Sequence, residues 1–391
     1  MATILFGWEL GDGLGHVQRL LPVARALAAR GHRPVFALCN LVEPWPLLQK
    51  EGFPVLCSPT WNSWPHRKDR PFLASSLADV LTVRGWGTVE SLLPLVESWR
   101  HLLECVQPSL IITDYAPTLC LAAYQSLPVV QVGNWFTMAP VHQPTFPILV
   151  PGQPPVMTQE ELLAIVQEVQ RRRARPVPPA LTSVLAAGDR FPTFYPELDP
   201  YHNVRTEPIW DPIESPPPLA TANPQPCFFA YLTAQNAHAE ANLTQMALTG
   251  IRGTVYLRNA SADLKERLRL QGLTVLEEPA PMGDVLAKFA VIVHHGGGTA
   301  NSALAAGRPQ ILFPQHLEQT TTAQAIAQLG VGVFLLNQAA PEAAGRALEQ
   351  VLGDRRYADN AMECARRLQH RPRRPVLDTL LQRCLERLDG V

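Results

Sequence analysis

The chain has 391 residues, of which 47% are hydrophobic and 17% are charged, and its net charge at pH 7 is −1. This composition excludes an intrinsically disordered chain, and no basic excess is present that would attract nucleic acid or an anionic membrane. The length exceeds what one ordinary core supports and suggests two domains. Seven scattered cysteines predict neither a disulfide framework nor a zinc site, so we expect a cytoplasmic protein.

The N-terminal residues have no signal-peptide pattern. No uninterrupted apolar run approaches the roughly 18 residues of a spanning helix, so we expect no integral membrane segment. A peripheral contact with a membrane stays open at this stage.

In the first half of the chain, apolar runs alternate with helical patterns. A strand over residues 3–8 precedes the glycine loop 11–15, and apolar residues then recur at three- and four-residue spacing over 17–28. A buried strand follows over 34–39. This strand–helix–strand order implies a right-handed crossover and a parallel sheet. Two further strands are expected at 110–113 and 129–132.

Residues 140–225 are rich in proline, and we expect 213–226 to be a stiff linker. The linker would separate an N-terminal domain, 1–212, from a C-terminal domain, 227–391, whose last helices could pack back on the first domain. Strands and helices alternate again after residue 227, which predicts two doubly wound α/β domains with ligands at the carboxyl ends of the strands. In the second half, strands are expected at 227–233, 254–257, 274–276, 291–294, 310–313 and 331–335, and helices at 343–388.

The apolar strand ending at Val293 runs directly into the loop His294-His295-Gly296-Gly297-Gly298-Thr299 and then into a helix. Glycines at a helix start present free backbone N–H groups and the positive end of the helix dipole, which suits a phosphate group. Thr299 would cap the helix or donate its hydroxyl to a phosphate, and His295 would add a donor. The alternative is a tight glycine turn whose histidines bind a metal or nothing.

The residues after the loop strengthen the phosphate interpretation. The stretch Gly307-Arg308-Pro309, then Phe313-Pro314-Gln315 and Glu318-Gln319, taken with the loop, resembles the donor-binding signature of GT-B nucleotide-sugar glycosyltransferases. The similarity is to UDP-glycosyltransferases and to their macrolide and glycopeptide relatives, and it covers about residues 285–335. It implies two Rossmann-like domains facing each other across a cleft, with 1–212 as the acceptor-binding domain and 227–391 as the nucleotide-sugar-binding domain. Without the resemblance, we would interpret Glu318 and Gln319 as ordinary residues of the first turn of a helix.

In such enzymes the loop holds the diphosphate of the donor, and the acid-Gln pair contacts hydroxyls of the donor sugar. The chain departs from the family pattern in a glycine loop that is one residue shorter, in Ser302 where a glutamate is frequent, and in Pro279-Ala280-Pro281-Met282 where Trp-x-Pro-Gln is usual. The nucleotide therefore stays open between UDP and dTDP. The donor-binding residues that the resemblance implies are Thr233, Met282, His295, Gly296, Gly297, Gly298, Thr299, Glu318 and Gln319.

The first glycine loop ends in Gly15-His16, directly before the first helix. Its spacing differs from the dinucleotide fingerprint, which disfavours a nicotinamide site. The resemblance implies that His16 is a general base and that Asp114, after the strand 110–113, is its partner. A base with a pKa near the working pH is efficient, and a carboxylate fixes its tautomer. The alternative is that both residues cap helices. Glu9, Asp12, Trp135 and Phe136 are weaker candidates for acceptor binding.

These expectations combine into an inverting transfer of sugar from a UDP- or dTDP-sugar to a hydroxyl of a small-molecule or lipid acceptor. The nucleotide sugar would be a co-substrate, and neither a metal nor another cofactor would be needed. Two alternatives stay open: a nucleotide-sugar epimerase of the same architecture, and a catalytically silent partner or nucleotide-sugar sensor. Release of diphosphate with and without an acceptor distinguishes them.

Overall fold

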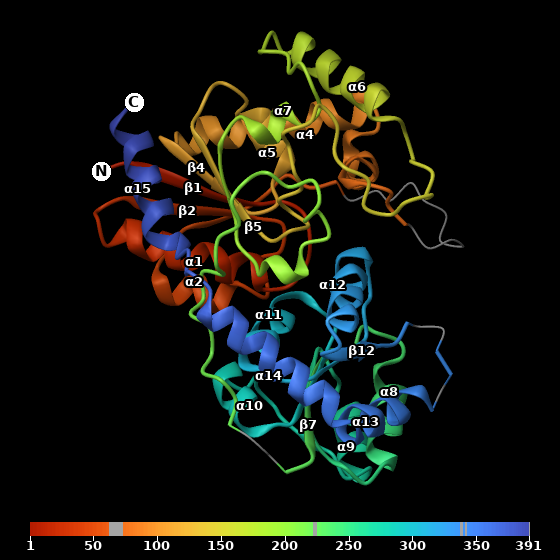
Figure 1. The fold of residues 1–391 in the computed structure, drawn as a ribbon. Coiled ribbons are helices and arrows are strands. Elements are labelled where there is room, and N and C mark those ends of the chain that lie inside the picture. The colour runs from red at the N-terminus through yellow and green to blue at the C-terminus, as the bar shows by residue number, and fades with distance from the viewer. Residues whose placement is uncertain (62–72, 222–224, 337–338, 341, 391) are drawn as a thin grey trace. The chain divides into compact units, whose positions relative to one another are not determined.

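The computed structural model describes residues 1–61, 73–221, 225–336, 339–340 and 342–390 (Figure 1). They form two compact units, one of Met1–Glu214 with Arg374–Val391 and the other of Ser215–Arg373. Each unit contains one six-stranded sheet flanked by helices. Within the described ranges, no helix combines the length and the apolar character that crossing a bilayer requires. Residues 222–224 of the expected linker lie outside the described residues.

The sheet of the first unit is entirely parallel, and its strands run in the spatial order β3-β2-β1-β4-β5-β6. The order of the strands reverses between β1 and β4, so the loops that follow these two strands lie beside each other at the carboxyl edge. This is the position where doubly wound sheets bind ligands. The strands are β1 (Thr3–Trp8), β2 (Arg33–Leu38), β3 (Val55–Cys57), β4 (Leu110–Thr113), β5 (Val129–Gly133) and β6 (Asp189–Pro192).

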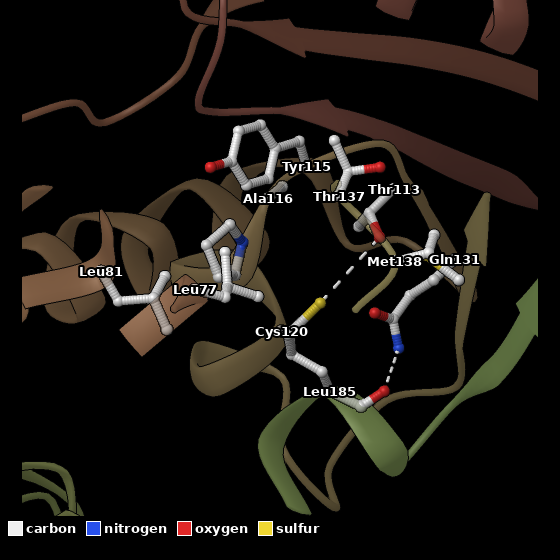
Figure 2. Close-up of a pocket in the computed structure, with 11 residues that line it drawn as sticks. Leu77, Leu81, Thr113, Tyr115, Ala116, Cys120, Gln131, Thr137, Met138 and Leu185 are labelled. Carbon is white, nitrogen blue, oxygen red and sulfur yellow. Dashed lines mark hydrogen bonds between the residues drawn. The ribbon is translucent and has the colours of Figure 1, made fainter. Parts of the chain in front are cut away.

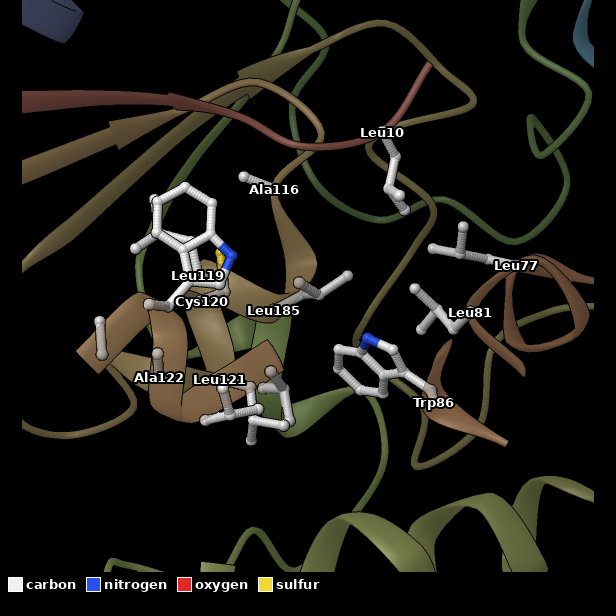
Figure 3. Packing of buried hydrophobic residues seen from close by; sticks show 14 of the residues in the cluster. Leu10, Leu77, Leu81, Trp86, Ala116, Leu119, Cys120, Leu121, Ala122 and Leu185 are labelled. Carbon is white, nitrogen blue, oxygen red and sulfur yellow. The ribbon is translucent and has the colours of Figure 1, made fainter. Parts of the chain in front are cut away.

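Helices cover both faces of this sheet because alternate strand residues are apolar on each side. On one face, Phe6 of β1 packs with Leu20 of α1 (Gly15–Ala28) and Leu380 of α15 (Val376–Asp389). On the other face, Leu5 belongs to a cluster with Trp99 of α4 (Val89–Val106) and with α5 (Pro117–Ala122), part of which Figure 3 shows. The remaining helices of the unit are α2 (Trp45–Glu51), α3 (Leu77–Leu81), α6 (Gln159–Arg172) and α7 (Ser183–Ala186), with a π-turn at Thr82–Trp86 and a 3-10 turn at Pro196–Leu198.

The second unit repeats this topology, with the parallel order β12-β11-β10-β7-β8-β9. Its strand order reverses between β7 and β10. The strands are β7 (Cys227–Thr233), β8 (Arg252–Arg258), β9 (Thr274–Val275), β10 (Val291–His294), β11 (Gln310–Leu312) and β12 (Gly332–Phe334). The helices are α8 (Ala239–Leu248), α9 (Ala262–Leu270), α10 (Met282–Lys288), α11 (Gly297–Ala306), α12 (Leu317–Gln328), α13 (Ala343–Gly353) and α14 (Arg355–His370).

The predicted fold class is confirmed, because each unit is a doubly wound α/β sheet of the Rossmann type. The helical pattern over 343–388 is divided into α13, α14 and α15. Of these, α15 belongs to the first unit, where its apolar side packs against α1.

Candidate active site

His16 lies at the reversal point of the first sheet, in the first turn of α1 directly after the loop that leaves β1. Its side chain is 12% exposed. The imidazole stacks on Trp8 with the ring centres 4.9 Å apart, and Tyr115 lies on a nearly parallel plane at 6.2 Å. Gly11 has a φ of +96°, and a Cβ on it would lie 2.5 Å from His16 Nε2. The position therefore needs glycine, and the imidazole is fixed by its surroundings.

Asp114 follows β4 and lies next to His16, as the sequence predicts for a dyad. Its side chain is completely buried, and Oδ1 lies 3.1 Å from His16 Nδ1. A carboxylate beside Nδ1 favours a proton on that nitrogen, which leaves Nε2 as the basic nitrogen. Burial by itself would raise the pKa of Asp114, but the charges of Arg19 and His16 and the hydrogen bonds from both side chains hold that pKa below its usual value.

Arg19 is a member of this cluster that the sequence analysis missed. Its Nη1 donates a hydrogen bond to Asp114 Oδ2, so the carboxylate is shared between His16 and Arg19. The signal was present in the sequence, because residues three apart in a helix lie on the same face, and His16 and Arg19 are so spaced in α1.

Glu9 does not lie where the sequence analysis expected it. The residue is buried, Oε2 accepts a hydrogen bond of 2.9 Å from the Thr118 backbone N–H, and Oε1 accepts one from the Thr118 hydroxyl. The expected contact with an acceptor hydroxyl is therefore wrong in this structure, because both oxygens are engaged inside the unit. Burial raises the pKa of Glu9 to about 7, although these hydrogen bonds oppose the rise. Asp12 is exposed, and its Oδ1 accepts from the Gly13 N–H at 2.8 Å.

The buried Glu9 carboxyl makes the stability of the first unit depend on pH. Between pH 4.5 and about 7 the folded state keeps a proton that the unfolded chain has released, so stability falls as pH rises through this range. The loss approaches about 3 kcal/mol. Glu9→Gln removes the titrating group, and its stability relative to the wild type should rise by about that amount between pH 5 and pH 8.

Urea unfolding followed by tryptophan fluorescence measures this difference, because all eight tryptophans of the chain lie before residue 215. Glu90→Gln, at an exposed position in the first turn of α4, is the matched control and should keep a constant difference from the wild type. An equally constant difference for Glu9→Gln would show that Glu9 does not hold a proton near neutral pH.

The two aromatic acceptor candidates after β5 differ in their placement. Trp135 is 3% exposed and belongs to the core cluster, so its expected place in a pocket wall is wrong. Phe136 is half-buried, and its ring packs edge-on against Tyr115 at 5.9 Å. Beside Tyr115 lies a small pocket, shown in Figure 2. Its lining residues are Leu77, Leu81, Thr113, Tyr115, Ala116, Pro117, Cys120, Gln131, Thr137, Met138 and Leu185.

The glycine loop of the second unit lies at the corresponding reversal point, between the end of β10 and the start of α11. Gly296 adopts φ 131° and ψ −135°, a conformation that in practice only glycine adopts. It precedes the first helical residue, Gly297. The expectation that Thr299 caps the helix is wrong, because it is the third residue of α11. The N–H groups of Gly297, Gly298 and Thr299 belong to the first turn, where an α-helix has no partners of its own for them.

His294 shapes this loop from inside the unit. It is buried, its Nδ1 accepts a hydrogen bond of 2.9 Å from the Gly296 N–H, and its Nε2 lies 2.9 Å from Gln310 Oε1. Because Nδ1 accepts, the proton lies on Nε2 and is donated to Gln310. Burial lowers the pKa of His294 to about 4, so the ring is neutral at physiological pH. This positioning role of His294 was not predicted from the sequence.

His295 is engaged at both ring nitrogens. Nδ1 lies 2.7 Å from the Phe313 carbonyl oxygen, and Nε2 accepts a hydrogen bond of 3.0 Å from the Thr233 N–H. The expectation that His295 donates a hydrogen bond to a diphosphate is therefore wrong in this structure, because its single proton is used on the carbonyl. Burial lowers the pKa of His295, and the positive charge of Arg258, at the end of β8, acts in the same direction. His295 thus ties the end of β7 to the glycine loop.

The remaining donor candidates lie on two helices. Glu318 and Gln319 are in the first turn of α12, where Gln319 Oε1 accepts from the Gln315 N–H at 2.8 Å. A Cβ on Gly296 would lie 3.1 Å from Gln319 Cα, so Gln319 supports the back of the loop. Met282 begins α10 and packs against an apolar cluster that includes Phe229. In the described part of the chain, no group of three or more His, Cys, Asp or Glu side chains is arranged to hold a metal.

Comparison with known protein families matches a segment that lies mostly in the second unit. Residues 261–381 match the family described as Erythromycin biosynthesis protein CIII-like, C-terminal domain, and this segment contains the glycine loop and Glu318-Gln319. The elloramycin glycosyltransferase of Streptomyces olivaceus is 34% identical over 142 residues, which are 36% of this chain and 36% of that protein. Over these segments the chain is similar to glycosyltransferases.

Solved structures extend the GT-B fold to the whole chain. The calicheamicin glycosyltransferase superposes with a TM-score of 0.68 at 17% identity, over 100% of this chain and 98% of that one. The spinosyn rhamnosyltransferase, solved with spinosyn aglycone, gives 0.65 at 19% identity over 98% and 100%, and its complex with thymidine diphosphate gives 0.62. Likeness at this identity establishes the fold. The sequence match to the elloramycin enzyme spans about a third of that relative's length.

Proposed function

We propose that this protein transfers a sugar from a nucleoside diphosphate sugar to a hydroxyl of a small-molecule or lipid acceptor, with inversion at the anomeric carbon. The observation that carries the proposal is the contact of 3.1 Å between His16 and the buried Asp114. A neutral imidazole whose Nδ1 faces a carboxylate has a basic Nε2, and the imidazolium formed by proton abstraction is stabilised by the same carboxylate.

The chemical step that we propose has one proton transfer and one exchange of bonds. The acceptor O–H gives its proton to His16 Nε2 as the oxygen attacks the anomeric carbon. The bond from that carbon to the phosphate oxygen breaks, and the nucleoside diphosphate leaves with the bonding electron pair. Attack from the face opposite the leaving group inverts the anomeric configuration. A general base in this role contributes roughly 10²- to 10⁴-fold to the rate.

We assign the diphosphate to the start of α11. The N–H groups of Gly297, Gly298 and Thr299, together with the helix dipole, would offset the charge that builds on the departing phosphate. His295 acts in this proposal as a positioning residue that holds the loop, because its ring nitrogens are engaged with Thr233 and Phe313. From the family resemblance, Glu318 and Gln319 would bind hydroxyls of the sugar, and Met282 would lie near the base.

We propose dTDP as the nucleotide and an apolar aglycone as the acceptor. The support is that the structurally similar spinosyn rhamnosyltransferase was solved with thymidine diphosphate and with spinosyn aglycone. Phe136 and Tyr115, which pack together near His16, would form part of the acceptor surface. Seven free cysteines support a location in the cytoplasm.

Calorimetric titration with dTDP and with UDP, each with excess EDTA, tests the donor assignment. We expect dTDP to bind more tightly than UDP, and we expect EDTA to leave both the binding of dTDP and the rate of transfer unchanged, because the start of α11 supplies the positive potential. A loss of transfer in EDTA that Mg²⁺ restores would show that a metal ion is required. Absence of binding of either nucleotide would contradict the donor site.

A further inference from the structure

In the described part of the chain, the Asp114 carboxylate contacts two side chains, the His16 imidazole and the Arg19 guanidinium. His16 Nδ1 lies 3.1 Å from Oδ1, and Arg19 Nη1 donates to Oδ2. The carboxylate is completely buried, and the side chains of His16 and Arg19 are 12% and 18% exposed. The three groups therefore interact with little screening by solvent.

An uncompensated carboxylate beside His16 would favour the protonated imidazole, which cannot accept a proton from an acceptor hydroxyl. The guanidinium on Oδ2 changes this balance, since arginine stays charged and cancels the charge of Asp114 at short range. With Arg19 in place, His16 keeps the orientation that Asp114 provides without the full attraction for a second proton.

We propose that Arg19 is a positioning residue that shares the Asp114 carboxylate with His16 and so weakens the attraction of that carboxylate for a second proton on the imidazole. This inference rests on the proposed function for its catalytic meaning, but its effect on the proton affinity of His16 is independent of that function. The other ionisable groups on the elements around the dyad are Glu9 and Asp12 before α1, Cys39 after β2, and Tyr115 after Asp114.

Arg19→Gln tests the inference by removing the charge and keeping a hydrogen-bond donor. The His16–Asp114 pair should then bind its proton more tightly, and the titration midpoint of His16 should rise by about one pH unit. NMR titration of the imidazole resonances, assigned to His16 by their loss in His16→Gln, measures this midpoint without any substrate. Arg19→Lys keeps the charge and should titrate near the wild type.

Arg25→Gln is the matched control, because Arg25 lies on the same helix and pairs with Glu51 at the surface. It should leave the His16 midpoint unchanged. The acidic limb of the pH profile of kcat/KM should move upward with the midpoint in Arg19→Gln. An unchanged His16 midpoint in folded Arg19→Gln would overturn the inference. A raised midpoint with an unmoved pH profile would support the inference and contradict the assignment of His16 as the base.

Discussion

His16→Ala should lower kcat for sugar transfer by about 10²- to 10⁴-fold and leave the affinity for dTDP unchanged. The imidazole supplies the base for the acceptor hydroxyl, whereas the proposed diphosphate site lies in the other unit, at the start of α11. The variant should fold, because the side chain is partly exposed and alanine suits a helix.

Single-turnover transfer and calorimetry with dTDP measure the two quantities. His101→Ala, at an exposed position on α4, is the control for histidine removal and should transfer sugar at the wild-type rate. A wild-type rate of transfer in His16→Ala would contradict the assignment of His16 as the base. If the variant also lost dTDP binding, its lower rate would be explained by a disturbed structure and not by the loss of the base.

Gly296→Ala should weaken dTDP binding by about 10- to 100-fold, because it distorts the glycine loop that presents the N–H groups of α11. The backbone at this position, φ 131° and ψ −135°, is strained for a residue with a Cβ. The new Cβ would also lie 3.1 Å from the backbone Cα of Gln319, so the loop or the start of α12 must move. Release of the loop would then misplace the N–H groups that we assign to the diphosphate.

Calorimetry with dTDP measures this effect, and far-UV circular dichroism checks that the second unit is folded. Gly353→Ala is the control, since this glycine ends α13 and a Cβ there meets no atom within 4 Å. Its affinity for dTDP should equal that of the wild type. An unchanged dissociation constant in Gly296→Ala would show that the nucleotide is bound without the glycine loop.

Much of the fold could be predicted because its signals are local. Apolar runs ending in glycine loops indicated β1 and β10, and the spacing of apolar residues indicated α1. The order of the strands within each sheet is a long-range property that periodicity does not contain, although right-handed crossovers restrict the choices. The return of α15 to the first unit likewise depends on contacts between residues more than 300 positions apart.

The contact between His16 and Asp114 could be predicted because, for each residue, its type and its place after a strand both carried information. Glu9 and Trp135 were misplaced because burial is decided by partners distant in sequence, namely Thr118 for Glu9 and the core cluster for Trp135. His295 has the residue type of a phosphate donor, but two backbone groups already use its ring nitrogens. The contact of Arg19 with Asp114 could be predicted only by combining two facts. Arg19 lies on the same helix face as His16, and Asp114 lies beside His16.

Acceptor-dependent release of dTDP tests the central claim most directly. Wild-type protein is incubated with a dTDP-sugar, with and without an apolar aglycone bearing a free hydroxyl, and dTDP and glycoside are quantified together. We expect release in the presence of the acceptor, an equal amount of glycoside with inverted anomeric configuration, and loss of both in His16→Ala. Conversion of the donor sugar without an acceptor, or tight dTDP binding with no release for any of a broad panel of acceptors, would contradict the account.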